Sequence, residues 1–258
     1  MQYETIRYTE DNNIAVVTLN RPEVLNALNT QMRAEITHAV RDAAKSARVI
    51  VLTGEGRAFC SGQDLGDGVD AATADLERTL RDEYEPMVHA IHDSPVPTIA
   101  AVNGTAAGAG ASLALSCDVV IATQSAVFLQ AFSRIGLIPD AGGTYMLPRL
   151  AGLARAMGAA LFADEITATQ AMNWGMIYEA VEDADFEAHW QARAAYLAKG
   201  PTASYRYLKD AMHASYDNTL KEQLALEAKL QNRCGQTRDF KEGVMAFLEK
   251  RKPRYEGR

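Results

Sequence analysis

The spacing of hydrophobic residues changes along the first 53 residues. Apolar and polar positions alternate over residues 3–20 around the polar turn at residues 11–13, a pattern that predicts a two-stranded hairpin. From Thr30 onward the apolar residues recur at helical spacing, and Thr30 itself is placed to cap that helix. Residues 49–52 are all apolar, which is typical of a strand buried on both faces. The pattern therefore predicts a strand-strand-helix-strand unit.

A second buried strand is predicted at residues 98–102, where a threonine is followed by four small or branched apolar residues. A loop after residue 66 and a helix over residues 76–91 precede this strand, and the prolines at 95 and 97 end the helix. A helix from about residue 111 and a strand at residues 118–122 follow it. The order of elements favours a layered α/β fold.

The remainder of the chain has mostly helical spacing, interrupted by a short strand-like segment at residues 175–181. The predicted helices cover residues 145–150, 154–162, 167–173, 186–199, 202–215, 219–234 and 237–250. We therefore expect the fold class to be α/β, with a core over residues 1–200 and a helical part over residues 201–258. No low-complexity linker separates the two parts, so the helical part is expected to pack on the core or on another subunit.

Composition narrows the classes of function. The formal net charge of -7 argues against a general nucleic-acid surface, because such surfaces carry a basic excess. The amino terminus lacks a basic region followed by an apolar run, and no apolar stretch reaches the ~18 residues of a membrane helix, so a cytoplasmic location is expected. Cys60, Cys117 and Cys234 are far apart and form no CxxC pair, which favours free thiols over a disulfide framework or a zinc site.

Both buried strands run into loops of glycine and small residues, at residues 54–65 and 103–111. The second loop opens directly into a helix, where small side chains leave backbone N–H groups bare and the helix dipole adds positive charge. Two such loops side by side could supply two N–H donors to one developing oxyanion. Close packing of strands against helices also requires small residues. The sequence leaves both explanations open.

Asp140 is the leading candidate for chemistry. It follows an apolar run that by itself indicates burial, and it lies between Pro139 and the glycines at 142 and 143. Proline fixes the backbone on one side, while the glycines allow a tight turn or a close approach to a ligand. Aspartate is also a favoured N-cap, and a helix is expected to begin near these glycines. Capping and catalysis are both compatible with this position.

These segments together resemble the enoyl-CoA hydratase/isomerase (crotonase) superfamily over essentially the whole chain. The motifs that carry the resemblance are LNRP at residues 19–22, NAL at 26–28, AFCSGQDL at 58–65, VNG at 102–104, AGAG at 107–110, CD at 117–118 and IPDAGG at 138–143. The resemblance implies a crotonase-like core of repeated strand-strand-helix units and a helical C-terminal part that mediates trimer contacts. It also implies an acyl-CoA thioester as substrate, a homotrimer or a homohexamer, and no cofactor or metal, since coenzyme A belongs to the substrate.

Site residues follow from the resemblance by position. It places the oxyanion hole on the backbone N–H groups of Gln63 and Ala109, which lie in the two small-residue loops. Backbone contacts to coenzyme A fall on Ala27, Asp64 and Leu65.

The resemblance also assigns residues from the helical segments. It places side-chain contacts to coenzyme A on Phe247 and Lys250, from the same or a neighbouring subunit. Tyr84 and Arg81 are expected to close the aromatic pocket from the helix over the site.

The departures from the family pattern change the expected reaction. Hydratases of the family carry two glutamates that activate and deliver water, whereas this chain has Ser112 and Phe132 at those positions. Without either carboxylate that route has no base, so hydration is disfavoured. Asp140 stands where these hydratases usually have glycine. We expect it to be the catalytic base in an apolar pocket walled by Phe132, Leu137 and Ile138, where desolvation raises its pKa.

Within the family, the closest resemblance is to the branch that converts ring-1,2-epoxyphenylacetyl-CoA to the seven-membered oxepin-CoA in bacterial phenylacetate degradation and also shifts double bonds in unsaturated acyl-CoAs. The alternatives are a general enoyl- or dienoyl-CoA isomerase or hydratase, and a non-catalytic scaffold of the same fold. A dehalogenase is disfavoured because that branch uses a tryptophan in the neighbourhood of Phe132. A further departure is Glu23, where many relatives carry a lysine for the coenzyme A phosphate, so Lys250, Arg251 or Lys252 is expected to take over that role.

Overall fold

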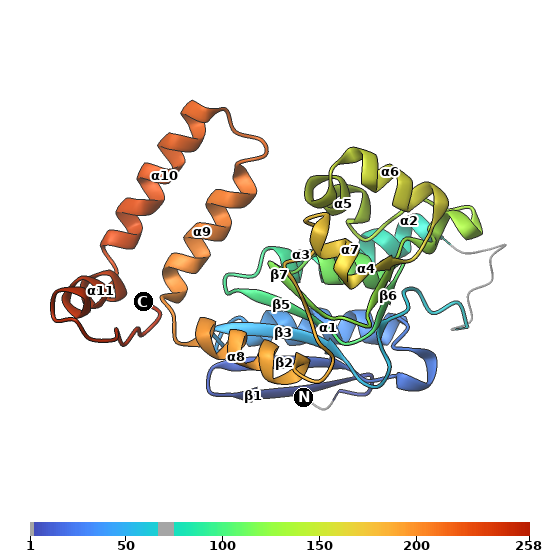
Figure 1. The fold of residues 1–258 in the computed structure, drawn as a ribbon, viewed down its shortest axis with the longest axis horizontal. Coiled ribbons are helices and arrows are strands. Elements are labelled where there is room, and N and C mark those ends of the chain that lie inside the picture. The colour runs from blue at the N-terminus through green and yellow to red at the C-terminus, as the bar shows by residue number, and fades with distance from the viewer. Residues whose placement is uncertain (1–2, 67–74) are drawn as a thin grey trace.

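The computed structural model describes residues 3–66 and 75–258, so the loop predicted after residue 66 lies largely outside the described residues. The main sheet has six strands in the order β1-β2-β3-β5-β7-β10 (Figure 1). These strands are β1 (Ile6–Asp11), β2 (Ile14–Leu19), β3 (Val49–Gly54), β5 (Thr98–Val102), β7 (Val119–Thr123) and β10 (Glu179–Val181). The first pair is antiparallel and the others are parallel. The α/β fold class and the predicted hairpin are confirmed.

A second sheet of four short strands was not predicted. It has the order β4-β6-β8-β9, with β4 (Ala58–Cys60), β6 (Thr105–Ala107), β8 (Val127–Leu129) and β9 (Ile166–Thr167). Strands β4 and β6 lie inside the two segments that the sequence pattern indicated as small-residue loops. Strands of two or three residues are too short to show a period in the sequence, which explains why they were missed.

The buried strands of the main sheet carry a hydrophobic layer on each face. On one face, Ile50 and Leu52 of β3 belong to the cluster that contains Ile36 and Val40 of α1 (Thr30–Ala43). On the other face, the alternate residues of β3 lie in a cluster with aromatic residues of α8 (Phe186–Ala198). Burial on both faces confirms the interpretation of the all-apolar run at residues 49–52.

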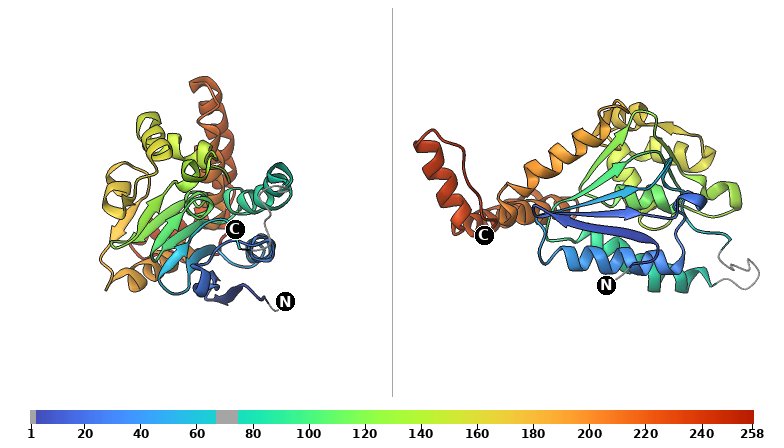
Figure 2. Two further views of the ribbon diagram at one scale, coloured as in Figure 1. Left: turned by 90° about the vertical axis from the view of Figure 1, so that its right-hand side faces the viewer. Right: turned by 90° about the horizontal axis from the view of Figure 1, so that it is seen from below.

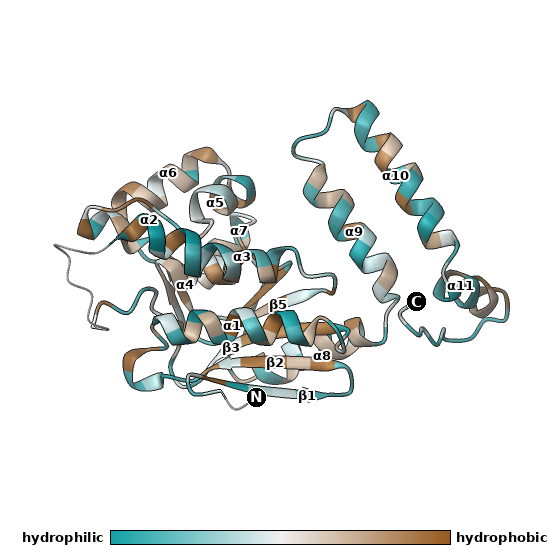
Figure 3. Ribbon diagram, turned by 180° about the vertical axis from the view of Figure 1, so that it is seen from behind, coloured by the Kyte–Doolittle hydropathy of each residue, from teal (hydrophilic) through white to brown (hydrophobic). Residues whose placement is uncertain are grey.

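Helix α1 begins as expected, but its cap is not the predicted one. Asn29 is the N-cap, and its Oδ1 accepts a hydrogen bond from the Met32 N–H at 2.8 Å. Thr30 is the first helical residue instead. Figure 3 shows α1 as a helix of mixed hydropathy, as expected for one that covers the sheet with one face and meets solvent with the other.

The helices that surround the site are short. They are η1 (Pro22–Val24), α2 (Leu76–Thr79), the π-helical η2 (Leu80–Tyr84), α3 (Glu85–His92), α4 (Ala109–Leu115), η3 (Ala131–Ile135), α5 (Gly143–Ala151), α6 (Leu153–Phe162) and α7 (Ala168–Asn173). The helix expected over residues 76–91 is therefore present, with a π-turn in its middle.

Helices α9 (Thr202–Ala214), α10 (Leu220–Gly235) and α11 (Arg238–Leu248) form an arm that projects from the sheet (Figures 1 and 2). The first helix of the arm begins at Thr202. Threonine side chains cap α10 and α11 at Thr219 and Thr237. No helix in the described part of the chain is long and apolar enough to cross a membrane.

Candidate active site

The two small-residue loops lie directly beside each other. Strands β4 and β6 pair in parallel, with Cys60 opposite Ala106, and each leads into its loop. A Cβ atom at Gly62 would lie 2.9 Å from the carbonyl oxygen of Ala107 and 3.3 Å from the amide nitrogen of Ala109. The φ of Gly62 is +96°, a value that side chains disfavour. Close packing therefore does require glycine here, and it also brings the Gln63 loop against the start of α4.

Two backbone N–H groups at this junction have no acceptor among the described residues. Gln63 forms a parallel bridge with Leu28, in which the Leu28 N–H donates to the Gly62 carbonyl at 2.7 Å and the Asp64 N–H donates to the Leu28 carbonyl at 3.1 Å. This pairing does not use the Gln63 N–H. Ala109 is the first residue of α4, so its N–H has no partner within the helix. Both groups are candidates to bind a ligand oxygen.

Asp140 lies on a tight turn rather than at a helix cap. Ala141 and Gly142 both have positive φ, and the Asp140 carbonyl accepts a hydrogen bond from the Gly143 N–H at 2.8 Å. The N-cap of α5 is Gly142, and no side chain caps this helix. The capping explanation for Asp140 is therefore wrong, and its carboxylate is left for another role.

The Asp140 carboxylate is poorly solvated. Its Oδ1 is buried and has no hydrogen-bond partner in the described structure. Desolvation by burial raises the pKa of Asp140 from 3.8 to about 6. A carboxylate with this pKa is ionised at neutral pH and is a stronger base than an ordinary aspartate.

The walls around Asp140 differ from the predicted ones. Phe132 is buried and lies 3.8 Å from the Cβ position of Gly108, so it belongs to the site. Leu137 and Ile138 are 38% and 76% exposed, and the prediction that they wall the pocket within this chain is wrong. Their apolar character indicated burial, but they lie on the outer loop between η3 and α5. Val88 of α3 packs beside the turn instead, 3.7 Å from the Cβ position of Gly142.

Tyr84 covers the Gln63 loop from η2. It is buried, and its hydroxyl donates to Gln63 Oε1 at 2.5 Å. Burial raises the pKa of Tyr84 despite the opposing charge of Arg33, so the phenol stays protonated at neutral pH. Arg81, on the same segment, is exposed and paired with Glu77 at 2.9 Å. The structure thus brings Tyr84 to the site but leaves Arg81 on the surface.

Two polar residues near the turn were not singled out from the sequence as site residues in their own right. Ser112 and Gln130 are fully buried, and the Ser112 hydroxyl and both amide atoms of Gln130 have no partner in the described structure. The Cβ position of Gly143 lies 2.8 Å from Ser112 Oγ and 3.8 Å from Gln130 Oε1. Uncompensated burial of polar atoms is unfavourable, which is common where a ligand or water completes a site. Gln130 had no sequence signal, because it lies at the end of a three-residue strand.

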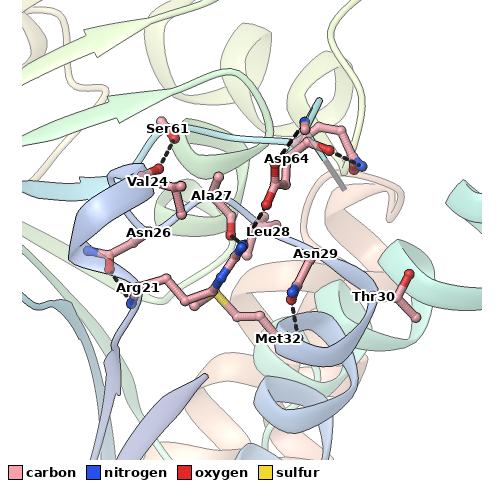
Figure 4. A network of polar contacts seen from close by, with 12 residues as sticks. Arg21, Val24, Asn26, Ala27, Leu28, Asn29, Thr30, Met32, Ser61 and Asp64 are labelled. Carbon is pink, nitrogen blue, oxygen red and sulfur yellow. Dashed lines mark hydrogen bonds and ion pairs between the residues drawn. The ribbon is translucent and has the colours of Figure 1, made fainter. Parts of the chain in front are cut away.

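The segment predicted to contact coenzyme A is held by the polar network in Figure 4. Arg21 Nη1 donates to the Ala27 carbonyl and to Asp64 Oδ2, both at 2.7 Å. Burial opposes ionisation of Asp64, but the bonds from Arg21 and from the Gly66 N–H lower its pKa. The Asp64 side chain is therefore occupied, whereas Leu65 beside it is exposed. Ala27, Asp64 and Leu65 lie together, as the resemblance requires.

The predicted C-terminal contacts are not at this site within one chain. Phe247 is 82% exposed on α11, and Figure 1 shows α11 at the far end of the arm from β6 and α4. Lys250 follows α11 and is also exposed. Arg251 is bound to Glu242 at 2.6 Å and to Glu249 at 2.6 Å. This pairing leaves Lys250 and Lys252 as the better candidates for a phosphate.

The cysteines and the possible metal ligands were also considered from the sequence. Cys60, Cys117 and Cys234 are free thiols, as expected. Among residues 3–66 and 75–258, no cluster of three metal-binding side chains is present.

The sequence and the structure were compared with protein families, with characterised sequences and with solved structures. The family profile for enoyl-CoA hydratase/isomerase matches residues 9–258. The chain is 62% identical over 258 residues, all of both chains, to a protein named probable enoyl-CoA hydratase from Rhodobacter capsulatus. It is 46% identical over 250 residues, 95% of both chains, to the 1,2-epoxyphenylacetyl-CoA isomerase of Escherichia coli. Subunit I of an enoyl-CoA hydratase from Geobacillus kaustophilus has the same fold, with a TM-score of 0.93, 35% identity and full coverage of both chains.

Proposed function

This chain belongs to the enoyl-CoA hydratase/isomerase family, and from that premise we propose that it is an acyl-CoA isomerase with Asp140 as its catalytic base. The observation that carries the proposal is the half-buried Asp140 carboxylate, which has an unpartnered oxygen and a pKa of about 6. A group of that pKa can take a proton at neutral pH and can also give it back. Both abilities are needed for an isomerisation with one acid-base residue.

The proposed reaction proceeds in two proton transfers. Asp140 removes a proton from a carbon of the acyl chain, and the electron pair moves onto the thioester oxygen to form an enolate. The N–H groups of Gln63 and Ala109 stabilise the oxyanion, and their lack of other acceptors supports this role. Asp140 then returns the same proton to another carbon of the conjugated system. No atom is gained or lost, so the step needs no cofactor.

We propose that the preferred substrate is ring-1,2-epoxyphenylacetyl-CoA, with double-bond shifts in unsaturated acyl-CoAs as a related activity. With the epoxide, the carbon–carbon bond shared by the oxirane and the six-membered ring also breaks, in the electrocyclic rearrangement of an arene oxide to an oxepin, and the proton shift by Asp140 then gives the conjugated isomer. The support is the identity to the E. coli isomerase over almost the whole chain. The test compares turnover of the ring epoxide with turnover of linear 3-enoyl-CoA esters by the purified protein. A rate on linear esters that exceeds the epoxide rate would favour a general enoyl-CoA isomerase.

Hydration is the second candidate, favoured by the name of the R. capsulatus relative. Against it, Ser112 and Phe132 occupy the positions where the resemblance places the two hydratase glutamates. The two reactions differ in their use of water. In D₂O, an isomerase with one proton-carrying base forms part of its product without deuterium, whereas a hydratase adds the elements of water to every product molecule. Complete conversion of a 2-enoyl-CoA to the hydroxyacyl-CoA would overturn the proposal. A protein that binds acyl-CoA but converts neither ester class would be a scaffold.

We further propose that the arm assembles the chain into a homotrimer or a homohexamer. An apolar groove runs between α9, α10 and α11, and its lining includes Leu208, Met212, Leu224, Phe240 and Val244. These side chains are exposed in the single chain, and exposed apolar patches of this kind mark interaction surfaces. A second copy could also carry Phe247 and Lys250 to this chain's site. Light scattering on the purified protein tests the assembly, and a monomer at micromolar concentration would contradict it.

A further inference from the structure

Arg33 is a buried cation that the proposed proton transfers do not use. It lies on α1 with an exposed fraction of 2%. Its guanidinium pairs with Glu83 at 2.5 Å, and its Nη1 donates to the Leu28 carbonyl at 2.7 Å and to Gln63 Oε1 at 2.9 Å. Burying a charge is unfavourable unless it is paired and its donors are satisfied. Here the surrounding residues supply both, so the guanidinium is held in one position.

The contacts of Arg33 converge on Gln63. Leu28 and Gln63 are the two partners of the parallel bridge, and Nη1 of Arg33 contacts the carbonyl of one and the side chain of the other. The same Gln63 Oε1 accepts the hydroxyl of Tyr84 at 2.5 Å. The backbone on either side of Gln63 is hydrogen-bonded to Leu28, and its side chain is bonded to Arg33 and Tyr84. Its N–H is the group that remains for the substrate.

Arg33 also joins this loop to the helical segment over the site. Glu83 and Tyr84 are consecutive residues of the π-helical η2, and the guanidinium carbon lies 4.7 Å from the centre of the Tyr84 ring. Burial opposes ionisation of Glu83, but the hydrogen bond from Arg33 lowers its pKa, so the pair is ionised and neutral overall. Arg33 therefore acts on the site through geometry rather than through an added net charge.

We propose that Arg33 is a positioning residue that aims the Gln63 N–H at the thioester oxygen and couples this donor to the segment carrying Tyr84. The inference rests on the proposed function only in placing that oxygen at the Gln63 N–H. Loss of an oxyanion donor typically lowers the rate by about 10²–10³-fold. Misalignment of a donor that is still present should cost less, on the order of 10–100-fold in kcat, with KM nearly unchanged.

The test measures polarisation of the substrate carbonyl directly. Phenylacetyl-CoA, which has neither a ring epoxide nor an isolated double bond, is labelled with ¹³C at the thioester carbonyl and bound to the whole protein. Isotope-edited infrared difference spectra then give the carbonyl stretching frequency in the bound state. We expect a downward shift in the wild type, and less than about half of that shift in Arg33→Met, because a donor must be well aligned to polarise the carbonyl. Arg33→Lys should restore part of it, since lysine offers a point charge but not the planar fork.

Arg48→Met is the matched control. Arg48 is also partly buried and bonded to backbone carbonyls and to Thr202, but it contacts no part of the site. This variant should keep the full wild-type shift. A full shift in Arg33→Met, or an equal loss in Arg48→Met, overturns the inference. If Arg33→Met does not fold, Gln63→Leu decides, because it removes the acceptor and leaves the Arg33–Glu83 pair. Retention of the full shift by Gln63→Leu would likewise overturn it.

The outcome is separable from that of the proposed function. The infrared measurement needs binding but no turnover, so a protein with no isomerase activity can still show the shift and its loss in Arg33→Met. In that case the inference stands and the proposed function fails. If the protein is an active isomerase but its carbonyl shift is absent in the wild type, or is unaffected by Arg33→Met, the inference fails and the proposed isomerase activity stands.

Discussion

Replacing Asp140 with asparagine should make the protein more stable at alkaline pH while it removes activity. A carboxylate whose pKa rises from 3.8 to about 6 is harder to ionise in the folded chain than in the unfolded chain. The difference amounts to about 3 kcal/mol at pH 8, because each pKa unit corresponds to about 1.4 kcal/mol. Asparagine is neutral at every pH and avoids this cost.

The sign of the pH dependence follows from the direction of the change. Because the folded-state pKa of Asp140 is raised, its protonated form favours the native state, and this contribution is fully present below pH 4. It is lost as pH rises toward 6 and beyond. Asp140→Asn should therefore exceed the wild type in free energy of unfolding by up to about 3 kcal/mol at pH 8, and the two should converge near pH 4. Urea denaturation at several pH values and at one protein concentration measures the difference.

Asp183→Asn is the control, because its change in free energy of unfolding at pH 8 should have the opposite sign to that of Asp140→Asn. Hydrogen bonds from the Thr123 hydroxyl and the Ser125 N–H lower the pKa of Asp183, so its ionised form favours the native state. That variant should lose stability at pH 8 relative to the wild type. The kcat/KM of the wild type should fall below about pH 6, because protonation of a single group, Asp140, removes the base. A pH-independent stability difference for Asp140→Asn, an activity limb near pH 4, or appreciable turnover by the variant would refute the reasoning.

Three further predictions concern the arm and the packing. Lys250→Ala should raise the dissociation constant of an acyl-CoA about tenfold through loss of one phosphate contact, measured by calorimetry; an unchanged constant would remove Lys250 from the site. Gly110→Ala should lower the free energy of unfolding by about 2 kcal/mol, as overpacked cores do, because the added Cβ would overlap a backbone carbonyl of β4. Gly158→Ala, whose Cβ would meet nothing within 4 Å, should instead stabilise α6 by about 0.5–1 kcal/mol, so equal effects would contradict the packing account. Burial and the stacked imidazole of His92 lower the pKa of His213, so acidification below about pH 6.5 should destabilise the arm, and His213→Phe should weaken that dependence in thermal melts.

The sequence was sufficient for the long elements and for the two small-residue loops, which follow the paired strands β4 and β6. The periodic helices and the all-apolar strands were predictable because burial on a sheet leaves a regular pattern. Strand β6 was not, since three small residues have no period. The N-cap of α1 was assigned to Thr30 because Asn29 and Thr30 are both suitable, and only the backbone angles distinguish them.

The remaining features of the site depend on the folded environment, which local sequence preferences do not determine. The partner of Arg33 is Glu83, 50 positions along the chain, so nothing near Arg33 in the sequence indicates a buried ion pair. Leu137 and Ile138 are apolar but exposed in the single chain, which apolar character alone does not predict. Asp140 itself was ambiguous until the cap of α5 proved to be Gly142. Local preferences identify the candidate residues, whereas their environment decides their roles.

The environment of Asp140 also bears on the choice between isomerisation and hydration. Water addition needs one group to activate water and another to deliver a proton, and the two must be in opposite protonation states at the same time. An isomerisation needs one group that changes state between its two steps. A pKa of about 6 suits the second task, since neither the ionised nor the protonated form is strongly disfavoured near neutral pH. Ser112 and Phe132 cannot supply a second carboxylate. A half-buried acid with an unpartnered oxygen and a pKa of about 6 therefore favours a proton returned to the substrate over a water molecule added to it.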